Sequence, residues 1–420
     1  MLNALRTASF LRLSLIAVAA SLAACNDDDA LRGGDDHDHT ESGGRLAFAT
    51  VEGDPQLLVH DLDSGQTTAI ALSNAPTAVY ASPEGRYAVV VQSGAGQVNF
   101  VDGGIWLHDD HAHADEPELL DFTLFGAKPA HYQTHEEQAA LFYDGEGGTP
   151  AKFDIFSDES LADGGVLASQ TLPAAVHGVA EPRDGYVLAV DYSAEEAAAG
   201  APRSAVKLYE LHDDHFHDEG RFETLCENLH GSATNEDYVA FGCQDGVLVI
   251  EQDGSSFTDS KIAIDRRITQ MAGHHAVPFL VAFAGAADDD ALFVIDPAAG
   301  SAEAFDWKDG AAVNRRQHTF DAHGEHLLIL DSAGTLHVLE VHDDHFDVAG
   351  RIDVLTGDDT AARMATSAGG DLAFVTDSAG KSVVVVDLED LEVVDHIDLG
   401  FAPVGIAWLG IAEEEHGHDH

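Results

Sequence analysis

The chain has 420 residues, of which 75 are acidic and 20 basic, so its formal net charge is −55 when histidine is neutral. Such a field repels nucleic acids and anionic lipid headgroups and attracts cations, so we expect no nucleic-acid partner. A hydrophobic fraction of 45% excludes a wholly disordered chain. The acidity also suits solubility in concentrated salt, an explanation that requires no ligand.

The first 24 residues have the features of an export signal. Arg6 and Arg12 precede a short apolar stretch, LSLIAVAASL, and the segment Leu22-Ala23-Ala24-Cys25 follows it. This segment resembles a bacterial lipobox, which implies that Cys25 becomes the lipidated first residue of the mature protein. We therefore predict a periplasmic protein whose contact with a membrane is only through that lipid anchor. The alternative is an ordinary secretory signal with an incidental cysteine, and both alternatives imply export.

Residues 25–43 are rich in Asp, Gly and His and predict a disordered tether, and residues 412–420 predict a disordered His-rich tail. Between them, residues 44–411 show short strands with turn signals every 8–12 residues. These strands repeat in units of 40–53 residues, which predicts a single all-β propeller. Seven units begin near Asn74, Ala127, Leu172, Glu227, Arg266, Val313 and Thr360.

An eighth unit is split between the two ends of the repeat region. RLAFATVEG and QLLVHDLDSG near the start lack an inner strand, and FAPVGIAWLG near the end has no partners of its own. Pairing the two would close the ring and remove its edge strands. We predict eight blades, with seven as the alternative if the region 172–226 is divided differently. The stretch EEAAAGAP at 195–202 predicts a loop insertion.

Four histidines lie at the same distance from an apolar strand in four separate repeats. His131, His177, His230 and His318 each stand eight residues before such a strand. Because the inner strands of a propeller surround one axis, equivalent positions converge there, and four imidazoles predict a metal site. Nitrogen ligands favour zinc, although copper and nickel also fit. A single histidine in an inner strand is more often a hydrogen-bonded spacer, and Gln270 and Arg363 at the same register do not fit a cation site.

A second group of histidines surrounds a repeated HDDH element. Its copies are 108–111, 212–215 and 342–345, each placed after the third strand of a unit. They should form outer hairpins on one face of the ring, where the loops carrying His135, His323 and His326 also open. A weaker second metal site on that face is one interpretation. The other, equally weighted for any one loop, is a set of solvated acidic turns.

Two cysteines remain after Cys25. Export places Cys226 and Cys243 in an oxidising compartment, and the segment between them suits a disulfide that joins neighbouring strands. A thiolate zinc site made by this pair is the less favoured alternative.

The stretch CENLHGSA…YVAFGCQDGVLVIE, the acidic His-rich tether and the inner-strand histidines together resemble the AztD-type periplasmic zinc metallochaperones. The resemblance covers roughly residues 35–411. It implies a protein that binds zinc and delivers it to the solute-binding protein of a zinc ABC importer. We expect a monomer. His230 lies inside the matching stretch, and His37 and His39 match the mobile His-rich segment of the family.

Two other functions stay open at this point. One is a lipid-anchored interaction scaffold with a halophilic surface. The other is a metal-dependent propeller hydrolase, although the chain has no G-x-S-x-G elbow and no phosphate loop, so we expect no enzyme.

Overall fold

The structure is a computed structural model that describes residues 43–50, 53–108, 111–285 and 289–411. The predicted signal peptide, Cys25, the tether with His37 and His39, and the tail 412–420 lie outside these residues. Within the described part of the chain, no helix combines the length and apolar character that crossing a membrane requires.

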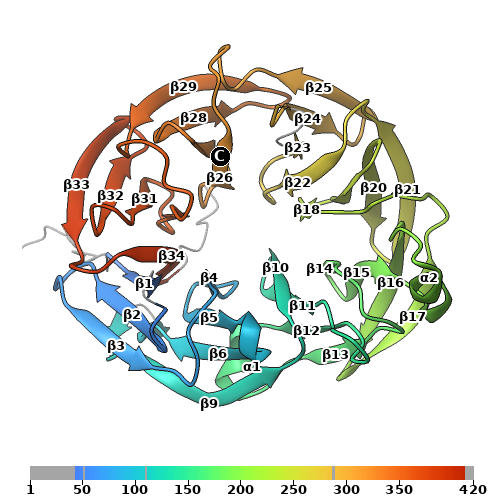
Figure 1. The fold of residues 1–420 in the computed structure, drawn as a ribbon, viewed down its shortest axis with the longest axis horizontal. Helices are drawn as coiled ribbons and strands as arrows, with labels where there is room; N and C mark the ends of the chain where they lie inside the picture. Colours follow the sequence, from blue (N-terminus) through green and yellow to red (C-terminus); the bar gives the residue numbers. More distant parts are fainter. Residues whose placement is uncertain (1–42, 51–52, 109–110, 286–288, 412–420) are drawn as a thin grey trace, which may run out of the picture. The chain divides into compact units, whose positions relative to one another are not determined.

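The described residues form eight four-stranded antiparallel sheets arranged around a common centre (Figure 1). We number these blades 1 to 8 in chain order. Blade 1 contains β1 (Arg45–Thr50), β2 (Gln56–Asp61), β3 (Thr67–Ala71) and β34 (Pro403–Leu409). Blade 2 contains β4 (Ala78–Ala81), β5 (Tyr87–Gln92), β6 (Gln97–Asp102) and β9 (Glu118–Phe125), with a short 3-10 helix η1 (Ser93–Ala95). A separate hairpin, β7 (Ile105–His108) and β8 (His111–Ala114), extends from it.

Blades 3, 4 and 5 carry most of the candidate site. Blade 3 contains β10 (Pro129–His135), β11 (Gln138–Tyr143), β12 (Lys152–Phe156) and β13 (Ala168–Thr171), with α1 (Asp158–Ala162). Blade 4 contains β14 (Ala180–Arg183), β15 (Tyr186–Asp191), β16 (Ala205–His212) and β17 (His215–Arg221), with α2 (Ala194–Ala199). Blade 5 contains β18 (Ser232–Thr234), β19 (Tyr238–Cys243), β20 (Gly246–Asp253) and β21 (Ser256–Ala263).

Three further blades complete the ring. Blade 6 contains β22 (Ile268–Ala272), β23 (Leu280–Ala284), β24 (Leu292–Asp296) and β25 (Ser301–Phe305). Blade 7 contains β26 (Arg315–Phe320), β27 (His326–Asp331), β28 (Thr335–Val341) and β29 (Phe346–Asp353). Blade 8 contains β30 (Met364–Thr366), β31 (Leu372–Asp377), β32 (Ser382–Asp387) and β33 (Glu392–Asp398).

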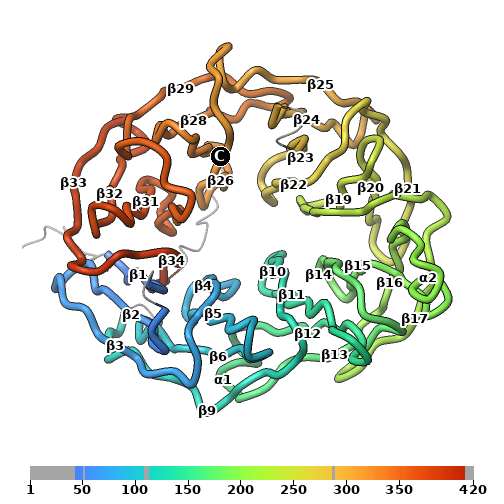
Figure 2. Tube along the Cα trace, in the orientation of Figure 1, coloured from blue at the N-terminus to red at the C-terminus, as the bar shows by residue number. Residues whose placement is uncertain are grey.

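The ring closes as the sequence predicts, by pairing its two ends. Strand β34 is the inner strand of blade 1 and pairs antiparallel with β1, with Arg45 opposite Leu409 and Phe48 opposite Ile406. The trace in Figure 2 shows the last strand lying beside the first. The prediction of an eight-bladed propeller with a split blade is confirmed.

The core lies between the middle strands of neighbouring blades. Every residue of β5 is buried, whereas the outer strand β33 has only exposed and half-buried side chains. This difference follows from position, because a middle strand is covered on both faces and an outer strand on one. The eight sheets therefore hold the inner strands in fixed places around the centre.

The insertion at 195–202 differs in detail from the expected loop, because it begins as the short helix α2. Ser193 caps this helix: its hydroxyl accepts from the Glu196 backbone N–H, and the Glu196 carboxylate accepts from the Ser193 N–H. This reciprocal capping box satisfies donors that a helix start otherwise leaves unpaired.

Consecutive strands of a blade run in opposite directions, so their connections alternate between two faces of the ring. We call the face with the first-to-second and third-to-fourth connections the hairpin face. The opposite face, with the second-to-third connections and the passages between blades, we call the entry face. The HDDH turns at 212–215 and 342–345 lie on the hairpin face, because each joins the third strand of a blade to the fourth. The copy at 108–111 differs from the prediction: it belongs to the separate hairpin of β7 and β8, and its two aspartates lie outside the described residues.

Candidate metal centre

Three of the four register histidines meet at the centre of the ring near its entry face. They come from consecutive blades: His131 from β10, His177 from the segment before β14, and His230 from the segment before β18. The ring centroids of His131 and His177 lie 4.8 Å apart, and those of His177 and His230 lie 5.3 Å apart. The third pair, His131 and His230, is separated by 6.2 Å. We call these three residues the central cluster.

The outward nitrogens of two cluster histidines are held by acceptors. His177 Nδ1 lies 2.9 Å from an Asp144 carboxylate oxygen, and His230 Nδ1 lies 2.8 Å from the Thr269 carbonyl oxygen. A carboxylate and a carbonyl only accept, so each Nδ1 carries the proton and each Nε2 of the neutral ring carries a lone pair. This arrangement is typical of metal-ligating histidines, whose other nitrogen donates to a carboxylate or carbonyl.

The spacing of one pair of inward nitrogens fits a tetrahedral cation. His131 Nε2 and His177 Nε2 are 3.4 Å apart. Two nitrogens that share a tetrahedral zinc at 2.0–2.1 Å are separated by about 3.3 Å. Three imidazoles supply three ligands, which leaves a fourth position for a carboxylate, a water or a ligand from another protein. The kind of donor therefore fits zinc, but the ligand atoms of the three imidazoles do not all lie within 4.8 Å of one another, so the cluster would have to contract around the ion.

A glycine directly follows two of these histidines, and it allows neighbouring segments of the chain to approach closely there. A Cβ on Gly178, directly after His177, would lie 2.1 Å from Val190 Cγ1. Gly231, directly after His230, has a φ of +75°, and a Cβ there would lie 2.8 Å from the Thr269 carbonyl oxygen that holds His230. The His-Gly pairs thus put His177 and His230 in lead-in segments, whereas His131 and His318 lie within strands β10 and β26.

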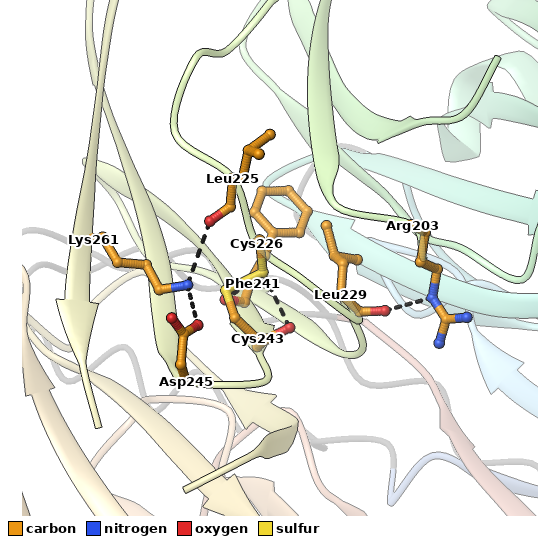
Figure 3. Close-up of a disulfide and its surroundings, with 9 residues drawn as sticks. Arg203, Leu225, Cys226, Leu229, Phe241, Cys243, Asp245 and Lys261 are labelled. Carbon is orange, nitrogen blue, oxygen red and sulfur yellow. Dashed lines mark hydrogen bonds and ion pairs between the residues drawn. A yellow bond between two sulfur atoms is a disulfide. The ribbon is translucent and has the colours of Figure 1, made fainter. Parts of the chain in front are cut away.

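A disulfide fixes the segment that carries His230. Cys226 and Cys243 are fully buried and joined by a bond with a Cα–Cα distance of 4.9 Å, which confirms the predicted pairing (Figure 3). The His230 N–H donates to the Gly242 carbonyl oxygen at 2.9 Å. The Arg203 Nε donates to the Leu229 carbonyl oxygen beside it. The lead-in to blade 5 is therefore tied to the rest of the fold at three points.

The surroundings favour neutral imidazoles. Burial, with smaller contributions from His177, His230 and Arg203 and against the opposing effect of Asp144, lowers the pKa of His131 to about 4. Burial also lowers the pKa of His230, and the neighbouring Arg203 and Arg267 act in the same direction. Because zinc binds the neutral ring, these two ligands are ready for a metal at neutral pH.

A buried carboxyl group belongs to a hydrogen-bond network that joins the three blades of the cluster. Glu181 in β14 accepts a hydrogen bond from Gln133 of β10, and the Gln133 amide also donates to the Ser232 carbonyl oxygen of β18 at 3.2 Å. The second carboxylate oxygen of Glu181 has no hydrogen-bond partner. Burial raises the pKa of Glu181 to about 7, against the opposing hydrogen bonds from Ser232 and Gln133.

His318 is held away from the central cluster by its own neighbours. Its Nδ1 lies 2.9 Å from an Arg315 guanidinium nitrogen, and its Nε2 lies 3.3 Å from the Met271 carbonyl oxygen. Its ring also packs on Phe283, with centroids 4.4 Å apart. Both nitrogens are therefore engaged, and blade 6 separates His318 from the three consecutive blades of the cluster. The structure brings together three of the four predicted ligands.

Gln270 and Arg363, which the sequence identifies as poor metal ligands at the same register, both form hydrogen bonds with other protein groups. Gln270 accepts a hydrogen bond from Arg315, and Arg363 donates to the Thr360 and Ala362 carbonyl oxygens beside it.

The candidates for a second site lie on the hairpin face but do not form one ligand set. His135 is buried, and burial lowers its pKa to about 3, with further lowering from Arg183 and His275. His323 is exposed. His326 Nδ1 lies 2.7 Å from an Asp321 carboxylate oxygen, a hydrogen bond that raises its pKa. Each of the three thus has a different environment.

Sequence reasoning missed the groups that orient the cluster. Asp144 and the Thr269 carbonyl lie in other blade segments, and no spacing in the sequence links them to His177 or His230. Glu181 carried a weak signal, because a charged residue in an inner strand of a propeller must be buried.

No family model matches the chain. The zinc chaperone AztD of Citrobacter koseri is 24% identical over 388 residues, which cover 87% of both chains. The solved structure of apo AztD from the same organism superposes with a TM-score of 0.73 at 20% identity, over 88% of this chain and 99% of that one. The chain is a homologue of AztD.

Another solved structure shares the fold with this AztD homologue. The dihydro-heme d1 dehydrogenase NirN superposes with a TM-score of 0.56 at 13% identity, over 87% of this chain and 75% of that one. At this identity the likeness concerns the propeller alone. The resemblance to AztD that the sequence indicates is confirmed for both sequence and fold.

Proposed function

We propose that this chain is an exported zinc chaperone. It holds zinc between His131, His177 and His230 and passes it to the solute-binding protein of a zinc ABC importer. The observation that carries the proposal is the central cluster, in which two imidazoles present Nε2 lone pairs inward while Asp144 and Thr269 hold their other nitrogens. The likeness to a zinc chaperone supports it.

The exposure of the cluster suits transfer better than storage. His177 is exposed, with 42% of its side chain accessible, whereas His131 and His230 are half-buried. A partner can therefore reach the metal from the entry face and replace ligands one at a time. In this proposal the chain acts as a periplasmic monomer anchored by Cys25, and His37 and His39 offer transient ligands.

Competition between the mature protein and a zinc chelator tests the binding step. His177→Ala/His230→Ala should lose the tightest zinc, because one remaining imidazole cannot hold it. His318→Gln is the matched control from the same sequence register, and it should keep that zinc because His318 already has two partners. Tight zinc that survives in the double variant would refute the central site.

Zinc transfer is tested separately. Zinc-loaded protein is mixed with the apo solute-binding protein of a zinc ABC importer, in the presence of a chelator that captures free zinc. Transfer that the chelator does not intercept supports direct exchange. An interaction scaffold would show no tight stoichiometric zinc, and a hydrolase would turn over a small ester or lactone.

A further inference from the structure

The HDDH elements are the most regular sequence feature that the central cluster leaves unexplained. Two copies are fully described, ELHDDHFH at 210–217 and EVHDDHFD at 340–347. In each copy the two aspartates form the turn of a β-hairpin. His212 pairs with His215 across the first turn, and the His342 N–H donates to the His345 carbonyl oxygen across the second.

Strand periodicity gathers the polar side chains of each hairpin on one face. Residues two apart on a strand share a face, and so do directly paired residues. His212, His215 and His217 therefore point the same way, and so do His342, His345 and Asp347. The intervening phenylalanine points inward, as Phe346 shows by packing in the core with 2% exposure.

The contacts in the second copy bring three donor groups together. The rings of His342 and His345 stack with centroids 5.0 Å apart, and His342 Nε2 lies 3.5 Å from an Asp347 carboxylate oxygen. One ligand atom from each of these three residues lies within 4.8 Å of the others. His345 Nδ1 lies 2.7 Å from the Asp344 carboxylate, so its Nε2 carries the lone pair.

The first copy is the same kind of hairpin with an imidazole in place of Asp347. Its three histidines do not each bring a ligand atom within 4.8 Å of the others, as the second copy does, and His212 Nε2 lies 2.8 Å from a Glu210 carboxylate oxygen. His215 Nε2 and His217 Nε2 are 3.2 Å apart, close to the separation of about 3.3 Å that two ligands of a tetrahedral zinc require. His215 Nδ1 lies 3.3 Å from Asp214, the equivalent of Asp344. His212 and His217 stack with centroids 4.2 Å apart.

An open pocket of about 670 Å³ adjoins the second copy. His342, His345 and Asp347 line it, together with His323 and Glu325 from the neighbouring first-to-second connection. The pocket gives a hydrated divalent cation room to approach and shed water, which a buried site would not.

We propose that each HDDH hairpin is an exposed zinc site on the hairpin face, separate from the central cluster. The ligands are His212, His215 and His217 in one hairpin, and His342, His345 and Asp347 in the other. The second aspartate of each turn orients the second histidine. With three ligands and open coordination positions, these sites capture zinc weakly and exchange it readily, within an acidic field that concentrates cations.

Zinc titration calorimetry tests this proposal on the full mature chain. The background chain carries alanine at the tail histidines His37, His39, His416, His418 and His420, so that the tails contribute no ligands. His212→Ala/His215→Ala/His217→Ala and His342→Ala/His345→Ala/Asp347→Ala should each remove one equivalent from the weaker class of sites. The tight class should be unchanged.

Two controls separate ligation from charge and from folding. His396→Ala removes an exposed histidine from the outer strand β33 and should remove no zinc. The turn aspartates stay in both triple variants, so an acidic turn that merely attracts cations would keep its zinc. Weak stoichiometry equal to the background in both triple variants would overturn the proposal.

The outcome is independent of the central site. His177→Ala/His230→Ala should keep the weaker class of sites. If wild type itself bound zinc only at the hairpins and had no tight site, the proposed chaperone function would be refuted and the hairpin sites would stand.

Discussion

At the scale of single residues, buried neutral histidines make the folded protein sensitive to acid. Burial lowers the pKa of His318 to about 3 and that of His274 to about 4, with smaller effects of neighbouring cations. Each ring gains a proton on unfolding below its ordinary pKa of about 6.5. The unfolded state then binds more protons than the folded state, so stability falls as the pH falls from about 6.5 towards these values.

His318 isolates this effect. When the pH is lowered from 7 to 5, we expect the free energy of unfolding of wild type to fall by about 2 kcal/mol more than that of His318→Gln. Urea unfolding of the zinc-free protein at both pH values measures it. Comparing two chains removes the opposite contribution of Glu181, whose raised pKa stabilises the protein towards acid. His396→Gln should show no such change, and a pH-independent difference for His318→Gln would contradict the prediction.

The residue scale also shows what the sequence could and could not predict. The spacing puts His131, His177 and His230 on consecutive blades, and these three do meet. The spacing cannot predict that the Arg315 guanidinium contacts His318 Nδ1, because that contact depends on side-chain direction within one strand. Nor can it predict Asp144, which reaches His177 only through the fold. The repeat pattern, in contrast, was sufficient for all eight blades because every strand lies between turn signals.

At the scale of elements, the lead-in segments are the critical parts of the centre. Gly178→Ala should destabilise the protein by about 1–3 kcal/mol, because the new methyl group overlaps Val190 and approaches Phe142. Movement of the segment would also weaken zinc binding through His177. Thermal unfolding and chelator competition measure the two effects. Gly148→Ala, where a Cβ would meet open space, is the matched control; similar losses in both variants would argue against a steric cause.

The disulfide has a comparable role for His230. Cys226→Ser/Cys243→Ser should lower the free energy of unfolding by about 3 kcal/mol, because the bond closes a short loop in the unfolded chain. Tight zinc should weaken as well, since the segment from Cys226 to His230 loses an anchor. Urea unfolding with and without zinc measures both, and an unchanged midpoint would show that the hydrogen bonds from Arg203 and His230 suffice.

At the scale of the whole molecule, charge opposes compactness. With 75 acidic against 20 basic residues, repulsion within the folded chain should be relieved by salt. The Debye length falls from about 10 Å at 0.1 M to about 3 Å at 1 M, so the Tm of zinc-free protein should rise over this range of sodium chloride. Calorimetry with a chelator present excludes trace divalent cations, and a falling Tm would show that ion pairs outweigh repulsion.

The pairing of β34 with β1 also sets the order of events when the chain is made. Strands β1, β2 and β3 leave the ribosome first, yet their inner neighbour comes from residues 403–409, more than 300 positions later. Blade 1 therefore cannot be completed until β34 has been made, and such a distant contact is slow to form. If the chain is exported as proposed, an incomplete ring suits its passage across a membrane before assembly.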